Sequence, residues 1–215
     1  FKAQAWTGLN RTGTLLIDWT TVTAGIGALT YTADWALPVS VWTALQTGRN
    51  YLSVQVFDSS PTPNVSIGED VFYVLKDTIA PSVTDNQAGD TIWRRAGGTL
   101  YNVDFADLGS GFTTAQYTVR SAPALGGTEI IPWTDIATAT GIPSYTADWG
   151  ANFGALQEAN TNYVSVRVFD LAGFVTTGQD AFFVLKDTTA PGVTDLQAGD
   201  DAWRSAGGTL YNVDF

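Results

Sequence analysis

The clearest feature of the chain is a period of two in its hydrophobic positions. In residues 163–169, three valines alternate with Ser165 and Arg167. Such alternation predicts a strand with one face in a core and the other in solvent. The apolar positions of this strand, and of a second one at residues 100–105, are Val164, Val166, Val168, Tyr101, Val103 and Phe105.

Short segments of this kind follow one another along the chain, separated by Gly, Pro, Asn and Asp, without a helical period. This succession is typical of an antiparallel sandwich. For one full copy we predict seven strands, A to G, at residues 83–86, 99–105, 116–121, 130–133, 145–149, 163–169 and 181–186. The predicted fold class is therefore all-β, and the best candidate for a helix is the short stretch 154–159.

The strand pattern belongs to an internal repeat. Residues 72–105 recur with few changes as residues 182–215, an offset of 110. Upstream, the sequence NYLSVQVFD at 50–58 matches NYVSVRVFD at 162–170, and YTADW at 31–35 returns at 145–149. Because the segments keep the same order in both copies, the chain is predicted to be a tandem array of small domains.

The domain boundaries are predicted from the segment Lys-Asp-Thr-x-Ala-Pro, found at 76–81 and 186–191. Proline favours an extended backbone there, as expected of a linker. We therefore expect strands C to G of one sandwich in residues 1–76, a complete sandwich in 77–187, and strands A and B of a following sandwich in 188–215. The chain is thus out of phase with its domains.

The two incomplete parts are complementary in the strands they contain. We expect strands A and B of one copy to complete strands C to G of the next, because open core faces and free sheet edges favour association. Either a continuous repetitive polypeptide or separate subunits that donate strands would give this pattern. In both cases the partners are copies of the chain, joined head to tail. The side chains expected to meet are Leu52, Val54 and Val56 on one side and Tyr211, Val213 and Phe215 on the other.

Two motifs resemble those of a known family. The sequence Val-Arg-Val-Phe-Asp-Leu-Ala-Gly at 166–173, with the Lys-Asp-Thr-x-Ala-Pro linker, is similar to the tandem bacterial immunoglobulin-like (Big) domains of large surface adhesins and cell-wall-associated proteins. The resemblance covers the whole chain and implies tandem immunoglobulin-like β-sandwiches, an extracellular or cell-surface location and calcium between domains. The chain departs from the family at Phe174, where Asn is usual, and at residues 59–63, where the turn differs.

Composition excludes several kinds of chemistry. The chain has no His and no Cys, which rules out Ser-His-Asp and Cys-His catalysis, imidazole or thiolate metal sites, and disulfides. A formal net charge of −11 disfavours nucleic acid and anionic lipid, and no apolar stretch is long enough for membrane insertion. A paired-carboxylate hydrolase stays formally open, but most Asp lie in repeated turns. We predict that the chain is not an enzyme.

The candidate binding site is a group of aspartates at the domain junction. In a sandwich of this strand order, the loop after strand B, the turn after strand F and the incoming linker lie at the same end. This placement brings together Asp107, Asp170 and Asp77. Hard oxygen ligands are what calcium requires, so calcium is the candidate cofactor, and no other is predicted. The alternative is that Asp77 and Asp170 only cap turns.

Eight tryptophans raise the question of glycan binding. Three pairs occupy matching positions in the two copies, which favours core or strand packing: Trp93 and Trp203, Trp19 and Trp133, and Trp35 and Trp149. Trp6 and Trp42 are unmatched, so they are the candidates for an exposed aromatic surface.

The leading prediction is a structural repeat segment of an extracellular filament or cell-surface stalk, in which each domain contacts mainly its neighbours. An adhesin or glycan-binding module is the first alternative, and it would need a non-repeated aromatic or polar patch. Accessory domains of a secreted enzyme are the second, and they would need a catalytic domain outside these residues.

Overall fold

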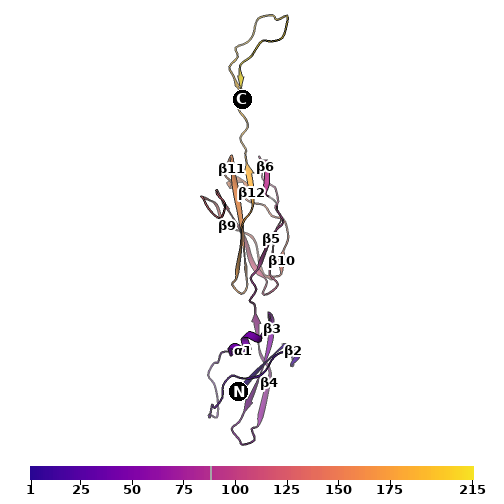
Figure 1. Ribbon diagram of the computed structural model, residues 1–215, viewed down its shortest axis with the longest axis vertical. Coiled ribbons are helices and arrows are strands. Elements are labelled where there is room, and N and C mark those ends of the chain that lie inside the picture. Colours follow the sequence, from indigo (N-terminus) through magenta and orange to yellow (C-terminus); the bar gives the residue numbers. More distant parts are fainter. Residues whose placement is uncertain (88) are drawn as a thin grey trace.

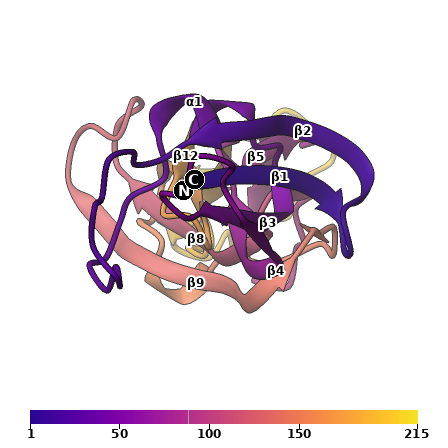
Figure 2. The same ribbon diagram turned by 90° about the horizontal axis from the view of Figure 1, so that it is seen from below.

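The computed structural model describes residues 1–87 and 89–215. The chain forms three successive parts along one long axis, with the N-terminal part at the bottom of Figure 1 and a C-terminal hairpin at the top. Strands make up nearly all of the regular structure, and the predicted all-β sandwich fold is confirmed. Viewed from below along the long axis, the three parts overlap in projection (Figure 2).

The first part is a single antiparallel sheet with a short helix on one face. The sheet has the order β2-β1-β3-β4, and its strands are β1 (Lys2–Gly8), β2 (Thr12–Thr21), β3 (Gly48–Phe57) and β4 (Val65–Lys76). The helix α1 (Val39–Ala44) lies over one end of this sheet, where Val41 and Leu45 pack against Ala5 and Leu52. Because α1 covers only that end, apolar side chains remain exposed on the rest of the face.

The middle part is a complete two-sheet sandwich. One sheet has the order β10-β7-β5 and the other the order β6-β12-β11-β8-β9. The strands are β5 (Ser82–Asp85), β6 (Asp90–Arg94), β7 (Val103–Ala106), β8 (Phe112–Arg120), β9 (Glu129–Ile142), β10 (Ser144–Tyr145), β11 (Asn160–Asp170) and β12 (Val175–Lys186). The core lies between these two sheets.

The predicted strand phase is confirmed by this core. All three alternating valines of β11 are fully buried and Arg167 is partly exposed, but Ser165, predicted to face solvent, is buried too, where its hydroxyl accepts a hydrogen bond from the N–H of Asp180. Tyr101, Val103 and Phe105 are buried opposite them. Trp149 fixes the position of Tyr101, because the two residues exchange backbone hydrogen bonds of 2.8 and 3.2 Å.

Two strands of the larger sheet differ from the prediction. β6 is an additional strand that pairs in parallel with β12, so the sandwich has eight strands rather than seven and is not entirely antiparallel. Residues 130–133, expected as strand D, lie in β9 beside β8. β6 escaped the prediction because Ile92 and Trp93 are adjacent and both more than half exposed, so no alternation marks the strand.

The interpretation of the matched tryptophans is only partly correct. Trp149 lies in the core, but Trp93 is 54% exposed. The helical segments also differ from the prediction. The stretch 154–159 contains only the end of the 3₁₀ turn η1 (Phe153–Ala155), and α1 was not predicted. α1 is rich in β-branched residues with weak helix propensity, so packing against the sheet must stabilise it.

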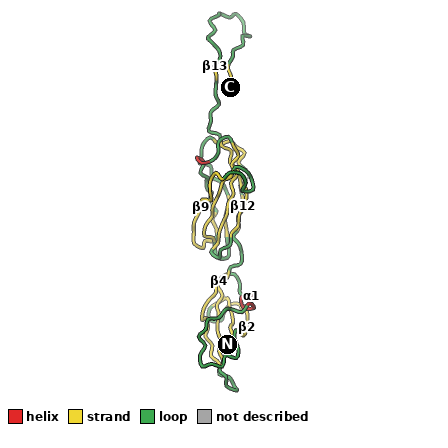
Figure 3. Tube along the Cα trace, turned by 90° about the vertical axis from the view of Figure 1, so that its left-hand side faces the viewer, coloured by secondary structure: helices red, strands yellow, loops and turns green. Residues whose placement is uncertain are grey.

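The last part is an extended hairpin beyond the sandwich (Figure 3). Its strands β13 (Thr194–Asp195) and β14 (Val213–Asp214) pair with Thr194 opposite Asp214. The middle part has the same register, since Thr84 of β5 lies opposite Asp104 of β7. The repeated hairpin therefore keeps the strand pairing of the sandwich while standing outside one.

Candidate functional site

Three carboxylates meet where the first part joins the middle part. Asp77 directly follows β4, Asp107 directly follows β7, and Asp170 ends β11. One carboxylate oxygen from each lies within 4.8 Å of the other two. Asp107 and Asp170 are buried and Asp77 is partly buried. The structure thus brings together the three residues that the sequence suggested, and we refer to them as the junction aspartates.

Asp77 ties the linker to the middle part. Its Oδ2 accepts a hydrogen bond of 2.7 Å from the backbone N–H of Ser110, and its Oδ1 accepts one of 2.9 Å from the N–H of Ile79. Burial acts to raise the pKa of Asp77, but hydrogen bonds from Ser110 and Ile79 outweigh burial and hold the pKa below its usual value. The carboxylate therefore stays ionised at neutral pH.

The loop after β7 requires glycine next to this carboxylate. A Cβ at Gly109 would lie 2.3 Å from Oδ1 of Asp77, closer than atoms can approach. A side chain there would push Asp77 away from Ser110. The sequence analysis did not single out Gly109 or Ser110, although the Asp-Leu-Gly-Ser-Gly run of this loop is a signal for a tight turn.

The carboxylate oxygens of Asp107 and of Asp170 differ in the hydrogen bonds that they accept. Asp107 accepts backbone hydrogen bonds on both oxygens, of 3.2 Å from Gly109 and 2.6 Å from Gly111. Asp170 accepts one of 2.8 Å on Oδ1 from the N–H of Phe174. Its Oδ2 is buried and has no hydrogen-bond partner among residues 1–87 and 89–215. A buried carboxylate oxygen without a partner is costly, so this atom calls for a cation or another donor.

The charge of the cluster is also uncompensated within the described residues. None of the ion pairs formed there involves a junction aspartate. Calcium binds carboxylate oxygens at roughly 2.3–2.6 Å, so two oxygens about 5 Å apart can share one ion. The donor set and the orphaned Oδ2 of Asp170 therefore fit calcium, which Asp77, Asp107 and Asp170 would hold together with carbonyl or water oxygens.

The first copy replaces this arrangement with internal hydrogen bonds. Asp58 is the repeat equivalent of Asp170, and Asn64 is the equivalent of Phe174. The Asn64 side chain donates to Oδ2 of Asp58, while Oδ1 accepts the N–H groups of Ser60 and Asn64. The Asn64 side chain contributes most to lowering the pKa of Asp58 to about 2, followed by the backbone of Asn64 and Ser60. In the first copy, therefore, neither oxygen of this aspartate is free.

A second candidate region is the uncovered face of the first sheet. Val56 is 47% exposed and Phe72 38% exposed, although their equivalents Val168 and Phe182 are buried. A hollow of about 460 Å³ lies over this face and is lined by Tyr31, Thr32, Ala33, Asp34, Trp35, Leu37 and Phe72. We refer to this region as the open face.

Of the residues expected to meet across copies, Leu52 is not on the open face. It is fully buried under α1, because Val41 and Leu45 cover it. Val54 is partly exposed and Val56 lies open. Tyr211, Val213 and Phe215 are all exposed on the C-terminal hairpin. The sequence analysis did not place Trp35 and Phe72 on the open face. Their positions in the repeat, which match those of Trp149 and Phe182, could have shown it.

The candidate aromatic surface is not assembled. Trp6 is partly buried, and its indole N–H is buried without a hydrogen-bond partner in the part of the chain that the structure describes. Trp42 lies on α1 and is 43% exposed, with the ammonium group of Lys76 5.4 Å from its ring centroid. Trp133 is covered in a similar way by the guanidinium group of Arg167, at 4.2 Å.

In comparisons with known proteins, no family model and no curated protein matches the chain. The resemblance to bacterial immunoglobulin-like domains therefore stays a proposal. Among the described residues, no helix is long and apolar enough to cross a membrane.

Proposed function

We propose that this chain is a structural repeat segment of an extracellular filament or cell-surface stalk, whose domains are held in line by calcium at their junction. The observation that carries the proposal is the position of Asp77. This linker residue is hydrogen-bonded to Ser110 of the following domain, and it lies beside two buried carboxylates. A cation bound there would contact linker and domain at once, so bending at the junction would cost binding energy.

The repeat supports the same function. The middle domain receives its linker at the end that carries the loop after β7, and its next linker leaves from the other end, so that successive domains add along one axis. The middle domain buries Tyr101, Trp149 and Phe182 in its own core, where the Tyr101 ring stacks on Phe182 and the Trp149 ring is tilted against Phe182. The side chains shared by the copies therefore serve packing, as expected of a spacer. Copies would join head to tail, and an extracellular location follows from the resemblance to surface proteins.

Small-angle X-ray scattering of the 215-residue chain tests this function. In calcium, the maximum dimension should match the extended arrangement, and chelation should shorten and broaden the distance distribution. The variant Asp170→Asn should behave in calcium as the unmodified chain does in chelator. Identical scattering in calcium and in chelator would contradict a calcium-stiffened spacer. Specific binding to a glycan array would instead favour the adhesin alternative.

A further inference from the structure

We propose that the C-terminal hairpin, residues 188–215, of a second copy of this chain docks on the open face of the first sheet and completes a sandwich there. This inference rests on the proposed structural function and names the partner and the surface through which copies join.

The first sheet has the same local geometry as the larger sheet of the middle domain. Both contain a register shift, between Leu52 and Val54 in β3 and between Val164 and Val166 in β11. A left-handed aspartate faces each shift, Asp70 with φ of 47° and Asp180 with φ of 50°. Asn50 and Asn162 also make equivalent hydrogen bonds to neighbouring carbonyls. The residues that cover one sheet can therefore be transferred to the other.

In the middle domain the hairpin of β5 and β7 covers this face. The ring of Tyr101 stacks on Phe182 with centroids 4.2 Å apart, and the indole N–H of Trp149 donates to the Val103 carbonyl at 3.3 Å. The equivalents on the open face are Phe72 and Trp35, whose rings already lie 5.9 Å apart. The groups that receive the hairpin are thus in place.

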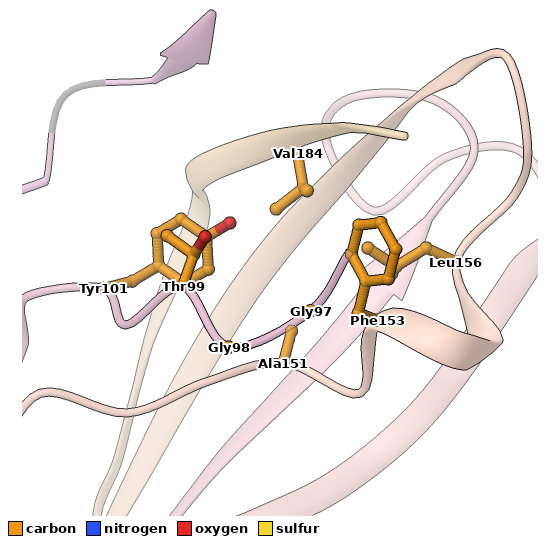
Figure 4. Close-up of a pocket in the computed structure, with 8 residues that line it drawn as sticks. All are labelled: Gly97, Gly98, Thr99, Tyr101, Ala151, Phe153, Leu156 and Val184. Atoms are coloured by element: carbon orange, nitrogen blue, oxygen red, sulfur yellow. The ribbon is translucent and has the colours of Figure 1, made fainter. Parts of the chain in front are cut away.

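The turn before β7 makes a second contact. Figure 4 shows Gly97 passing close to Phe153 and Ala151, in a hollow that Tyr101, Leu156 and Val184 also line. A Cβ on Gly97 would be 3.0 Å from the Cβ of Phe153, so the chain approaches as closely as glycine allows. The equivalent turn of the hairpin contains Gly207 and Gly208, with open space around both. On the first sheet the receiving residues are Trp42, Leu45 and Val74.

The C-terminal hairpin is already formed in the free chain. Besides the register of β13 and β14, the hydroxyl group of Tyr211 donates to Asp200 at 3.2 Å, as that of Tyr101 does to Asp90. Arg204 pairs with Asp200 as Arg94 pairs with Asp90. The apolar side chains that would enter a core are exposed: Val193 at 67%, Tyr211 at 56% and Phe215 at 96%. Docking would bury them while the pairing of β13 with β14 is kept.

The hairpin that fills the open face is proposed to come from a second copy of the chain. The hairpin and the first sheet lie at opposite ends of the long axis, with the middle domain between them (Figures 1 and 3). Residues 188–215 therefore do not cover the first sheet of the same copy. Since the two surfaces are different, the contact is heterologous and repeats from copy to copy, as a fibre unless the rotation between copies closes a ring.

Engineered cysteines test the docking, because the chain has none of its own. In the middle domain, a Cβ placed on Gly178 would lie 3.8 Å from the Cβ of Val83, within the range of a disulfide. The equivalent pair across copies is Gly68→Cys and Val193→Cys. These two variants, each in a full chain, are mixed under mild oxidation. Gly192→Cys, one residue before Val193, replaces it in the control.

We expect a covalent heterodimer from Gly68→Cys with Val193→Cys, and at least tenfold less from the control with Gly192→Cys. Equal yields in the two mixtures, or no heterodimer, would overturn the docking. Circular dichroism checks that Gly68→Cys keeps its strands, and light scattering of the cysteine-free chain gives an independent measure. That chain should associate with rising concentration, and Tyr211→Asp should be monomeric. An unmodified chain that stays monomeric would overturn the proposal too.

Failure here is separable from failure of the proposed function. Tyr211→Asp cannot affect the junction aspartates, which lie in other parts of the chain. If that variant keeps a calcium-dependent extended shape while no chain associates, the spacer function stands and the docking is lost. If copies associate but their shape does not depend on calcium, the docking stands and the stiffened junction is lost.

Discussion

The Asp77 carboxylate accepts a hydrogen bond from the backbone N–H of Ser110, a residue 33 positions further along in the following domain. This contact crosses from the linker to the loop after β7. It places a charged group beside two buried carboxylates, so we expect the binding of a cation to depend on the geometry of the junction.

Replacing Asp77 with Ala should remove the calcium effect on stability. A ligand at a hundredfold above its dissociation constant stabilises the folded state by about 2.7 kcal/mol, so calcium should raise the Tm of the unmodified chain by several degrees. Differential scanning calorimetry in calcium and in chelator measures the difference. The matched control is Asp187→Ala, at the same place in the next linker. Asp187 accepts a hydrogen bond of 3.0 Å from the N–H of Thr189, as Asp77 does from Ile79, but it is not one of the junction aspartates. This variant should therefore keep the calcium-dependent shift in Tm. Loss of the shift in both variants would contradict the assignment.

Replacing Phe174 with Asn should weaken calcium binding by about 10- to 100-fold, the usual range for altering a group next to a metal ligand. The new amide would donate to Oδ2 of Asp170, as Asn64 does to Asp58 in the first copy. Isothermal titration calorimetry with calcium measures the affinity. Leu171→Asn in the same exposed turn is the control and should bind as the unmodified chain does. Unchanged affinity in Phe174→Asn would show that the Asp170 oxygen is not a ligand.

Replacing Val166 with Asp should unfold the middle domain. Val166 is fully buried, and an unpaired buried charge costs several kcal/mol, which is comparable to the stability of a small domain. Arg167→Ser should cost only about 1 kcal/mol, through lost contacts with Trp133 and with Gln116. Urea denaturation followed by circular dichroism compares them. Similar midpoints for the two variants would mean that the strand phase is wrong.

Stability should fall at high pH through Tyr101. Burial, and then the charge of Asp90, raise the pKa of Tyr101 to about 12 in the folded chain, against about 10 in an unfolded one. A raised folded pKa stabilises the fold below pH 10, and that contribution is lost as the pH rises from about 10 to about 12. Tyr101→Phe should show a smaller decline in this window in urea titrations at stepped pH. A decline of equal size would contradict the role of this hydroxyl.

The parts of the fold that the sequence could predict are those governed by side-chain alternation. The valines of β11 and the residues of β7 alternate strictly, and their faces were predicted correctly. β6 could not be found in this way, because its Ile92 and Trp93 lie exposed at a sheet edge. α1 was missed because its six residues form a helix only against the sheet. Leu52 was placed on the open face because α1, which covers it, was not predicted.

The junction aspartates were predicted from topology, because loops at one end of a sandwich must converge. Their roles depend on finer geometry. Among the described residues, the Oδ2 of Asp170 has no partner because the backbone N–H of Phe174 donates only to Oδ1. The close approach of Gly109 to Asp77 depends on the path of the loop after β7. Neither follows from residue type or spacing.

The most direct test of the calcium-stiffened junction is a distance distribution measured across it by pulsed electron paramagnetic resonance. Ser66→Cys on β4 and Thr138→Cys on β9 are exposed sites in the first and middle parts of a chain without other cysteines. With spin labels there, the account predicts one narrow peak in calcium and a broad distribution in chelator or in Asp170→Asn. A distribution of the same width under all three conditions would contradict it.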